Sequence, residues 1–184
     1  MSVTRLRLLA RSLCAALAMT GCGLIPGELF GDAPAQPPPG MPPAIGPTVE
    51  IGRGESLGIS WRYLVYESEM GTCTVVDQGG NASGGGCGGA LGPGPGSSAI
   101  GLSSVGFSTG SPTTVEGFAT DEVNEVWIEV ADGEPVRAEL MSLAPAEREG
   151  AIFFAFVPEG LRLVQLVALG DGGQVVDDEP LPRP

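Results

Sequence analysis

From about residue 48 onward the chain consists of short apolar runs separated by glycine, aspartate and proline. No stretch keeps a helical period of apolar residues, whereas several runs alternate apolar and polar side chains, as half-buried strands do. Residues 59–66 are an example. Trp61 and Tyr63 fall on the face expected to be buried, and Tyr66 falls on the face expected to be exposed. The pattern therefore predicts an all-β domain.

Eight or nine strands of this kind can be placed, with turns roughly every 8 to 12 residues. Besides residues 59–66, the expected strands cover residues 72–77, 100–109, 113–119, 126–130, 136–141, 151–157, 161–169 and 175–176. The run 151–157 is apolar on both faces, as a central strand is. The run 161–169 fits two registers equally well. This spacing predicts an antiparallel β-sandwich over residues 48–178.

The clearest hairpin is expected around Asp132-Gly133, a turn signal between two alternating runs. Its first strand places Trp127 on the solvent face. Trp127 and Tyr66 are therefore candidates for a face that contacts a partner. The alternative is that they are singly exposed aromatic residues, which are common on protein surfaces and need no functional explanation.

The segment 126–176 resembles the second half of bacterial immunoglobulin-like and fibronectin-like modules, including its VALGDGGQVV ending. The mature chain as a whole is similar to uncharacterised secreted lipoproteins of high-GC Gram-positive bacteria. Those proteins pair a Trp-Arg-Tyr strand and a cysteine-bearing glycine loop with such an ending. The resemblance implies an immunoglobulin-like β-sandwich located outside the cytoplasm, and it carries over no catalytic residue.

A secretory signal precedes the domain. Three arginines are followed by an apolar region of residues 12–19, which is shorter than the roughly 20 apolar residues that span a bilayer. Thr20 and Gly21 before Cys22 resemble the bacterial lipobox, which implies cleavage after residue 21 and a diacylglyceryl group on Cys22. We therefore expect a cell-envelope protein anchored to the membrane through Cys22. The alternative is an ordinary cleaved signal that leaves Cys22 as a thiol.

The cysteines support export. Cys14 leaves with the signal and Cys22 carries the lipid, so that Cys73 and Cys87 remain. An even pair in an exported protein indicates a disulfide. A metal site is the rival interpretation, but two thiols in a chain without histidine give too few ligands for the usual zinc sets. No cofactor is expected.

Three segments of biased composition complete the domain organisation. Residues 22–47 hold the lipidated cysteine and a proline-rich stretch, expected to be a disordered, extended spacer rather than a ligand for another domain. Residues 78–98 are so rich in glycine that a mobile loop is expected, pinned by Cys87 to the strand that carries Cys73. Residues 179–184 form an acidic, proline-broken tail.

The charge of the chain limits its partners. It has 9 basic residues, all of them arginine, against 22 acidic residues, and the formal net charge is −13. Nucleic acids and anionic lipid surfaces require basic patches, so neither is expected to bind. The acidic surface could attract cations or basic partners, but a soluble surface is the simpler explanation.

Motifs with catalytic meaning are weak. Residues 106–110 match G-x-S-x-G, the nucleophile elbow of serine hydrolases, yet the chain has no histidine or lysine to accept the proton from Ser108. No Gly-Lys-Ser/Thr follows the glycine-rich segment, which argues against phosphate binding. Neither motif predicts an enzyme.

Carboxylates provide the remaining chemistry. Asp121-Glu122 and residues 177–179 could act as an acid–base pair, and Asp171 with Asp177 or Asp178 could bind calcium. All lie in expected loops or the tail, where solvated acids are the default, and their spacing matches no EF-hand loop. We therefore predict no catalytic residue and no metal site.

These observations lead to a functional hypothesis. The chain is expected to be a non-enzymatic envelope lipoprotein, a tethered β-sandwich that binds or assists another envelope component, either a protein or a glycan. A carboxylate-type enzyme acting on glycans and a purely structural subunit of an envelope complex are the alternatives.

Overall fold

The computed structural model describes residues 36–88, 92, 98–107 and 111–182, and these residues form three four-stranded antiparallel sheets. The expectation of an all-β fold is confirmed. In chain order the elements are β1 (Val49–Ser56), β2 (Ile59–Ser68), β3 (Gly71–Gln78), β4 (Asn81–Cys87), β5 (Ile100–Gly106), β6 (Thr113–Ala119), β7 (Glu125–Val130), β8 (Val136–Arg137), β9 (Glu139–Ser142), the 3-10 turn η1 (Ala144–Ala146), β10 (Ala151–Val157), β11 (Leu163–Leu169) and β12 (Val175–Pro180).

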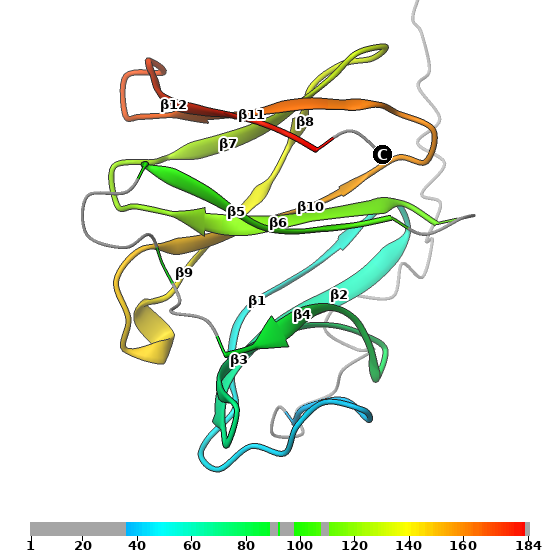
Figure 1. Cartoon of the computed structure of the whole chain (residues 1–184), viewed down its shortest axis with the longest axis vertical. Coiled ribbons are helices and arrows are strands. Elements are labelled where there is room, and N and C mark those ends of the chain that lie inside the picture. Colours follow the sequence, from blue (N-terminus) through cyan, green and yellow to red (C-terminus); the bar gives the residue numbers. More distant parts are fainter. Residues whose placement is uncertain (1–35, 89–91, 93–97, 108–110, 183–184) are drawn as a thin grey trace, which may run out of the picture.

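The sheets are stacked in three layers, with sheet A (β1-β2-β3-β4) below sheet B (β5-β6-β10-β9) and sheet C (β12-β11-β7-β8) above it (Figure 1). Sheet B is therefore covered on both faces. Its β10 has the apolar sequence AIFFAFV, and all but its first residue are buried, which confirms the expected central strand. No helix of the described residues is long and apolar enough to cross a membrane.

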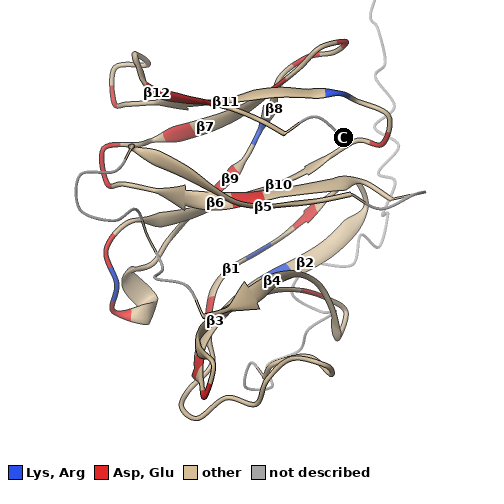
Figure 2. Ribbon diagram, viewed as in Figure 1, with Lys and Arg blue, Asp and Glu red and all other residues tan. Residues whose placement is uncertain are grey.

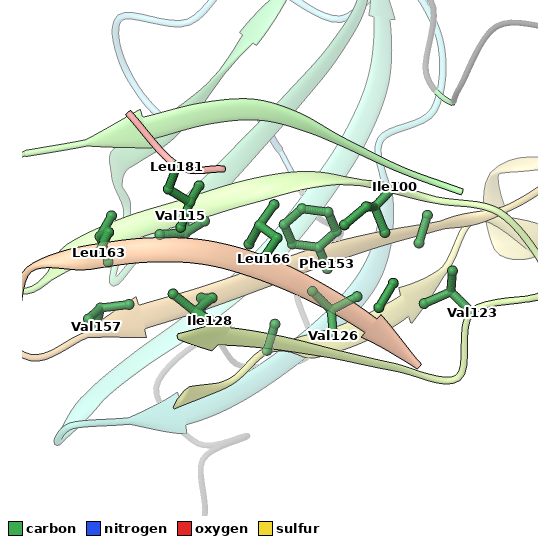
Figure 3. Packing of buried hydrophobic residues seen from close by; sticks show 14 of the residues in the cluster. Ile100, Val115, Val123, Val126, Ile128, Phe153, Val157, Leu163, Leu166 and Leu181 are labelled. Atoms are coloured by element: carbon green, nitrogen blue, oxygen red, sulfur yellow. The ribbon is translucent and has the colours of Figure 1, made fainter. Parts of the chain in front are cut away.

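Sheets B and C enclose the larger core, shown in Figure 3. Phe153 of β10, Leu166 of β11 and Ile128 of β7 are fully or almost fully buried there. The hairpin expected at Asp132-Gly133 is confirmed, since β7 pairs with β8 through Trp127 opposite Arg137. The second strand is shorter than expected because the chain passes at the buried Ala138 from sheet C into β9 of sheet B.

A β-bulge resolves the ambiguous register of β11. The pairing of β11 with β7 shifts between Leu163 and Gln165. One extra residue in a strand rotates the following side chains to the other face. Leu163 and Leu166 consequently both point into the core, while Val164 between them is exposed. The two registers that the sequence allows are thus both used, one on each side of the bulge.

Strand β2 is buried on both faces, which corrects the expected amphipathic strand. Tyr63 and Val65 pack against sheet B, and Leu64 and Tyr66 belong to a second cluster on the outer face of sheet A. Tyr66 is only 2% exposed, so the expectation that it lies on an exposed partner face is wrong. Tyr66 is buried because another segment of the chain packs over it, and strand periodicity does not reveal such a segment.

That cover is the described part of the proline-rich segment, residues 36–47, here named the strap. Met41 and Ala44 of the strap pack against the cluster that contains Tyr66, and Pro38 is buried. The backbone N–H of Ile45 donates a hydrogen bond to the carbonyl of Glu67 (2.9 Å). Residues 36–47 therefore lie on sheet A, in contrast to the free spacer that was expected of residues 22–47.

Much of the glycine-rich segment is a strand. Asn81–Cys87 forms β4 and pairs with β3, whereas the composition predicted a loop from Gln78 onward. Asp77 is fully buried and orders the turn between β3 and β4. Its carboxylate accepts hydrogen bonds from the Gly80 N–H (2.6 Å) and the Arg62 Nε–H (2.7 Å). Gly84–Gly86 contribute backbone hydrogen bonds without side-chain packing. Residues 89–91 and 93–97 of the expected loop lie outside the described residues.

The acidic residues before the C-terminus also lie in a strand, which extends the expected 175–176 to Pro180 (Figure 2). Asp177 and Glu179 point toward β5 and accept hydrogen bonds from the backbone N–H groups of Ile100 (3.1 Å) and Leu102 (3.0 Å). These carboxylates connect the edges of sheets B and C, because they satisfy donors on β5 that no neighbouring strand reaches. Leu181, which follows this strand, is buried in the core and its N–H donates to the carbonyl of Val164 (3.0 Å), so the first residues of the expected tail 179–184 belong to the folded domain.

The turn between β1 and β2 is strained. Leu57 and Gly58 both have positive φ (55° and 75°), as a two-residue type I′ turn requires, and Leu57 is 53% exposed. Asparagine adopts this conformation at lower cost than leucine. We expect Leu57→Asn to raise the free energy of unfolding by about 0.5–1 kcal/mol, measured by urea denaturation.

Leu57→Ala is the matched control, because it removes the exposed side chain but keeps a non-glycine residue with a positive φ. Alanine should leave the stability nearly unchanged. An equal gain from alanine and asparagine would show that side-chain exposure, and not backbone strain, is what the substitution relieves.

Candidate functional site

The interface between sheets A and B is the most elaborate part of the described chain. Phe154 of β10 lies at its centre, with ring centroids 5.5 Å from Trp61, 6.1 Å from Tyr63 and 4.8 Å from Phe156, each in an edge-to-face arrangement. Such aromatic pairs stabilise a fold by more than the burial of their apolar area alone. Sheet A is therefore attached to the sandwich by an aromatic core of its own.

A buried carboxyl group lies in this interface. Glu116 of β6 is only 3% exposed. Its Oε1 accepts a hydrogen bond from the Tyr63 hydroxyl of β2 and another from the Thr74 Oγ1 of β3 (3.3 Å). The three residues thus join one strand of sheet B to two strands of sheet A, and sequence analysis did not single out Glu116 or Thr74. The single acid within the apolar run TTVEGFA was the available signal.

Burial controls the protonation of this cluster. Desolvation raises the pKa of Glu116 above its ordinary value of 4.5, and the hydrogen bonds from Tyr63 and Thr74 oppose that shift only in part. The pKa of Tyr63 is raised well above 10.0 by burial and by the charge of Glu116. Both groups are shielded from solvent between two sheets, so this geometry fits a role in docking the sheets rather than in reacting with a substrate.

Two cavities lie at opposite ends of β2. One, of about 330 Å³, lies between the strap, the end of β2 and η1, where Glu67 pairs with Arg148 (2.6 Å). Tyr66 lines it, and the Tyr66 hydroxyl has no hydrogen-bond partner among the described residues. The other, also of about 330 Å³, begins at Ile59 and extends to Phe107 after β5.

Of the predicted site residues that the structure describes, the two cysteines are brought together and the two aromatic residues are not. Cys22 lies outside the described residues. Cys73 and Cys87 form the expected disulfide, with their Cα atoms 4.1 Å apart. Trp127 lies on the outer face of sheet C, as expected, although it is partly buried, and its Nε1–H donates to Glu125 Oε2 (2.9 Å). Tyr66 is on sheet A, so the two aromatic residues do not share a face.

The acids singled out as alternatives have structural partners. Asp121 accepts a hydrogen bond from the Gly150 N–H (3.1 Å), and Asp171 accepts one from the Asn124 side chain (2.8 Å). Asp177 is engaged with β5, as described above. Within the described part of the chain no three histidine, cysteine or acidic residues gather as a metal site would need. Of the G-x-S-x-G match, residues 108–110 lie outside the described residues.

Comparison with protein-family models, with curated proteins and with solved structures finds no match to this chain. No family is therefore identified. Of the resemblance drawn from the sequence, the antiparallel, strand-based architecture is confirmed.

The buried carboxyl of Glu116 gives stability a specific pH dependence. Because its folded pKa is raised, the folded protein keeps the proton at pH values where the unfolded chain has lost it. Stability is therefore highest below about pH 4.5 for this group and falls as the pH rises toward the folded pKa. We expect Glu116→Gln, whose amide oxygen can still accept from Tyr63, to abolish this fall, measured by urea denaturation from pH 4 to pH 8.

Glu129→Gln on β7 is the control, since Glu129 lies on an alternating position outside the core. The stability gained from Glu116→Gln over the unmodified protein should grow with pH, whereas the Glu129 variant should show no such growth. A gain from Glu116→Gln that stays constant from pH 4 to pH 8 contradicts the assignment.

Proposed function

We propose that this chain is a lipid-anchored protein of the cell envelope that binds another envelope component and has no enzymatic activity. The observation that carries the location is the Cys73–Cys87 disulfide, because such bonds persist outside the reducing cytoplasm. Together with the signal-like N-terminus and the lipobox resemblance at Cys22, it supports a body held at a membrane surface.

We further propose an immunoglobulin-like arrangement for sheets B and C. The orders β5-β6-β10-β9 and β12-β11-β7-β8 correspond to A-B-E-D and G-F-C-C′ when the strands of residues 100–180 are lettered in sequence. Sheet A is then an additional layer on the outer face of the A-B-E-D sheet. Such sandwiches are frequent in extracellular binding modules, and this analogy of fold motivates a binding role without defining a ligand.

The roles of the acids favour binding over catalysis. Of the carboxylates that could serve as an acid–base pair, Asp121, Asp177 and Glu179 accept hydrogen bonds from backbone N–H groups that fix loops and strand edges. The carboxyl with the raised pKa, Glu116, is enclosed between two sheets. A general acid has to reach its substrate, and this group does not.

The anchor is tested by removing the acceptor sulfur. We expect Cys22→Ser to move the protein from the membrane fraction to the soluble extracytoplasmic fraction. The substitution removes the sulfur that would accept the lipid, and stable membrane attachment needs two or more acyl chains. Cys14→Ser is the matched control and should leave the protein on the membrane, since Cys14 lies within the expected signal. A Cys22→Ser protein that still sediments with membranes contradicts the proposed anchor.

The binding role is tested in intact cells with a photoreactive residue. The chain contains no lysine, so amine-directed crosslinkers have no side chain to attack. We expect benzoylphenylalanine placed at position 107 or 127 to give a reproducible adduct of higher mass upon irradiation, with a protein or a glycan. Unirradiated cells provide the baseline, and the absence of any adduct at both positions contradicts a binding function.

A further inference from the structure

The cavity at the Ile59 end of β2 is a groove between the ends of sheets A and B. Figure 1 shows the β1–β2 turn, the end of β5 and the beginning of β6 on the same side of the molecule. Sheet A contributes residues of β2, β3 and β4, and sheet B contributes residues of β5, β6 and β10. The groove, here named the end groove, is lined by Ile59, Gln78, Ser83, Gly106, Phe107, Ser111, Pro112, Thr114 and Phe156.

An exposed aromatic ring stands in the end groove. Phe107 is 51% exposed, whereas the other large aromatic side chain of the lining, Phe156, is 4% exposed and belongs to the core. A phenylalanine left half in solvent beside a cavity offers a flat apolar face to a ligand. Ile59 and Pro112 extend the apolar part of the lining.

The polar part of the end groove consists of neutral groups. Gln78, Ser83, Ser111 and Thr114 provide one amide and three hydroxyl groups, each able to donate and to accept hydrogen bonds. The Ser83 hydroxyl donates to the carbonyl of Val76 (3.2 Å), which leaves its oxygen able to accept. The side chains of Gln78 and Thr114 have no hydrogen-bond partner among the described residues.

Charge distinguishes this groove from the cavity at the other end of β2. None of the described residues that line it is charged, although the chain carries 22 acids. The cavity at the other end of β2 has Glu67, Glu147 and Arg148 in its lining. A charged ligand would find no counter-ion in the end groove. A neutral ligand with many hydroxyl groups would lose little free energy on leaving water, because amide and hydroxyl partners replace its hydration.

We infer that the end groove binds a neutral glycan. One sugar ring would lie with its C–H face against Phe107, and its hydroxyl groups would exchange hydrogen bonds with Gln78, Ser83 and Thr114. The volume of about 330 Å³ lies at the lower end of the range for small-molecule sites and limits the enclosed portion to a small part of a chain. This inference rests on the proposed binding function and specifies the chemistry of the ligand.

Affinity electrophoresis of the full chain in native gels tests the inference. The gels contain dextran, mannan, glycogen or hydroxyethylcellulose as neutral probes, polygalacturonate as the charged probe, and a detergent without a sugar headgroup. We expect at least one neutral polysaccharide to retard the protein and polygalacturonate not to. Phe107→Ala should weaken that retardation at least tenfold in apparent affinity, and Gln78→Ala should weaken it severalfold.

Val175→Ala is the matched control, because Val175 is 60% exposed and lies on β12, away from the end groove. It should bind like the unmodified protein, and urea denaturation of every variant excludes unfolding as the cause of a loss. Failure of all neutral probes, or undiminished retardation of Phe107→Ala, overturns the inference. If a protein adduct still forms at position 127 in cells, the proposed binding function survives while the glycan assignment does not.

Discussion

The architecture depends on one strand whose two faces serve different cores. Along β10, Ile152, Phe154 and Phe156 pack against sheet A, while Phe153, Ala155 and Val157 pack against sheet C. Successive side chains of a strand point to opposite faces, so a continuous apolar run is what a strand between two layers requires. Glu116 on the neighbouring β6 faces sheet A, and the hydroxyl groups of Tyr63 and Thr74 compensate part of the cost of burying it.

A second constraint acts at the edges of the sheets. Exposed strand edges invite pairing with other chains, and inward-pointing charges are one protection against it. Asp177 and Glu179 have this position on β12, and they also bond the N–H groups of β5. On the opposite side the chain passes from β8 to β9 and links the same two sheets covalently. Sheets B and C are thus joined along both margins, so that ligand contact is left to the ends and outer faces.

The sequence predicted the fold where side chains alternate or are uniformly apolar. The run 113–119 coincides with β6 and the run 151–157 coincides with β10, because burial on one or both faces is encoded locally. Strand β4 was missed because glycine has no side chain to form a pattern, and its order depends on pairing with β3 and on the disulfide. Tyr66 was wrongly expected to be exposed, because the strap that covers it is a separate segment that the alternation of side chains within β2 does not reveal.

The candidate sites were less predictable than the fold, because they depend more on contacts between segments far apart in the chain. The Cys73–Cys87 pair follows from counting cysteines, and the outer position of Trp127 follows from strand period. The end groove joins the ends of six strands from two sheets, and Glu116 meets Tyr63 and Thr74 only after those sheets dock. The sequence marks Glu116 as the single acid of β6, but it does not reveal the partners of Glu116 or the lining of the groove, because each depends on the relative position of elements far apart in the chain.

The strap and the end groove have a defined relation through β2. Ile45 of the strap bonds the chain to Glu67, near the end of β2, whereas the end groove begins at Ile59, the first residue of the same strand. Eight residues of extended chain separate these points by about 26 Å at 3.3 Å per residue. The chain therefore reaches sheet A from its N-terminal side at one end of β2, and the groove opens at the other. The rigid strand β2 thus keeps the strap contact at Glu67 apart from the end groove, so that the strap and a ligand in the groove would not compete for the same surface.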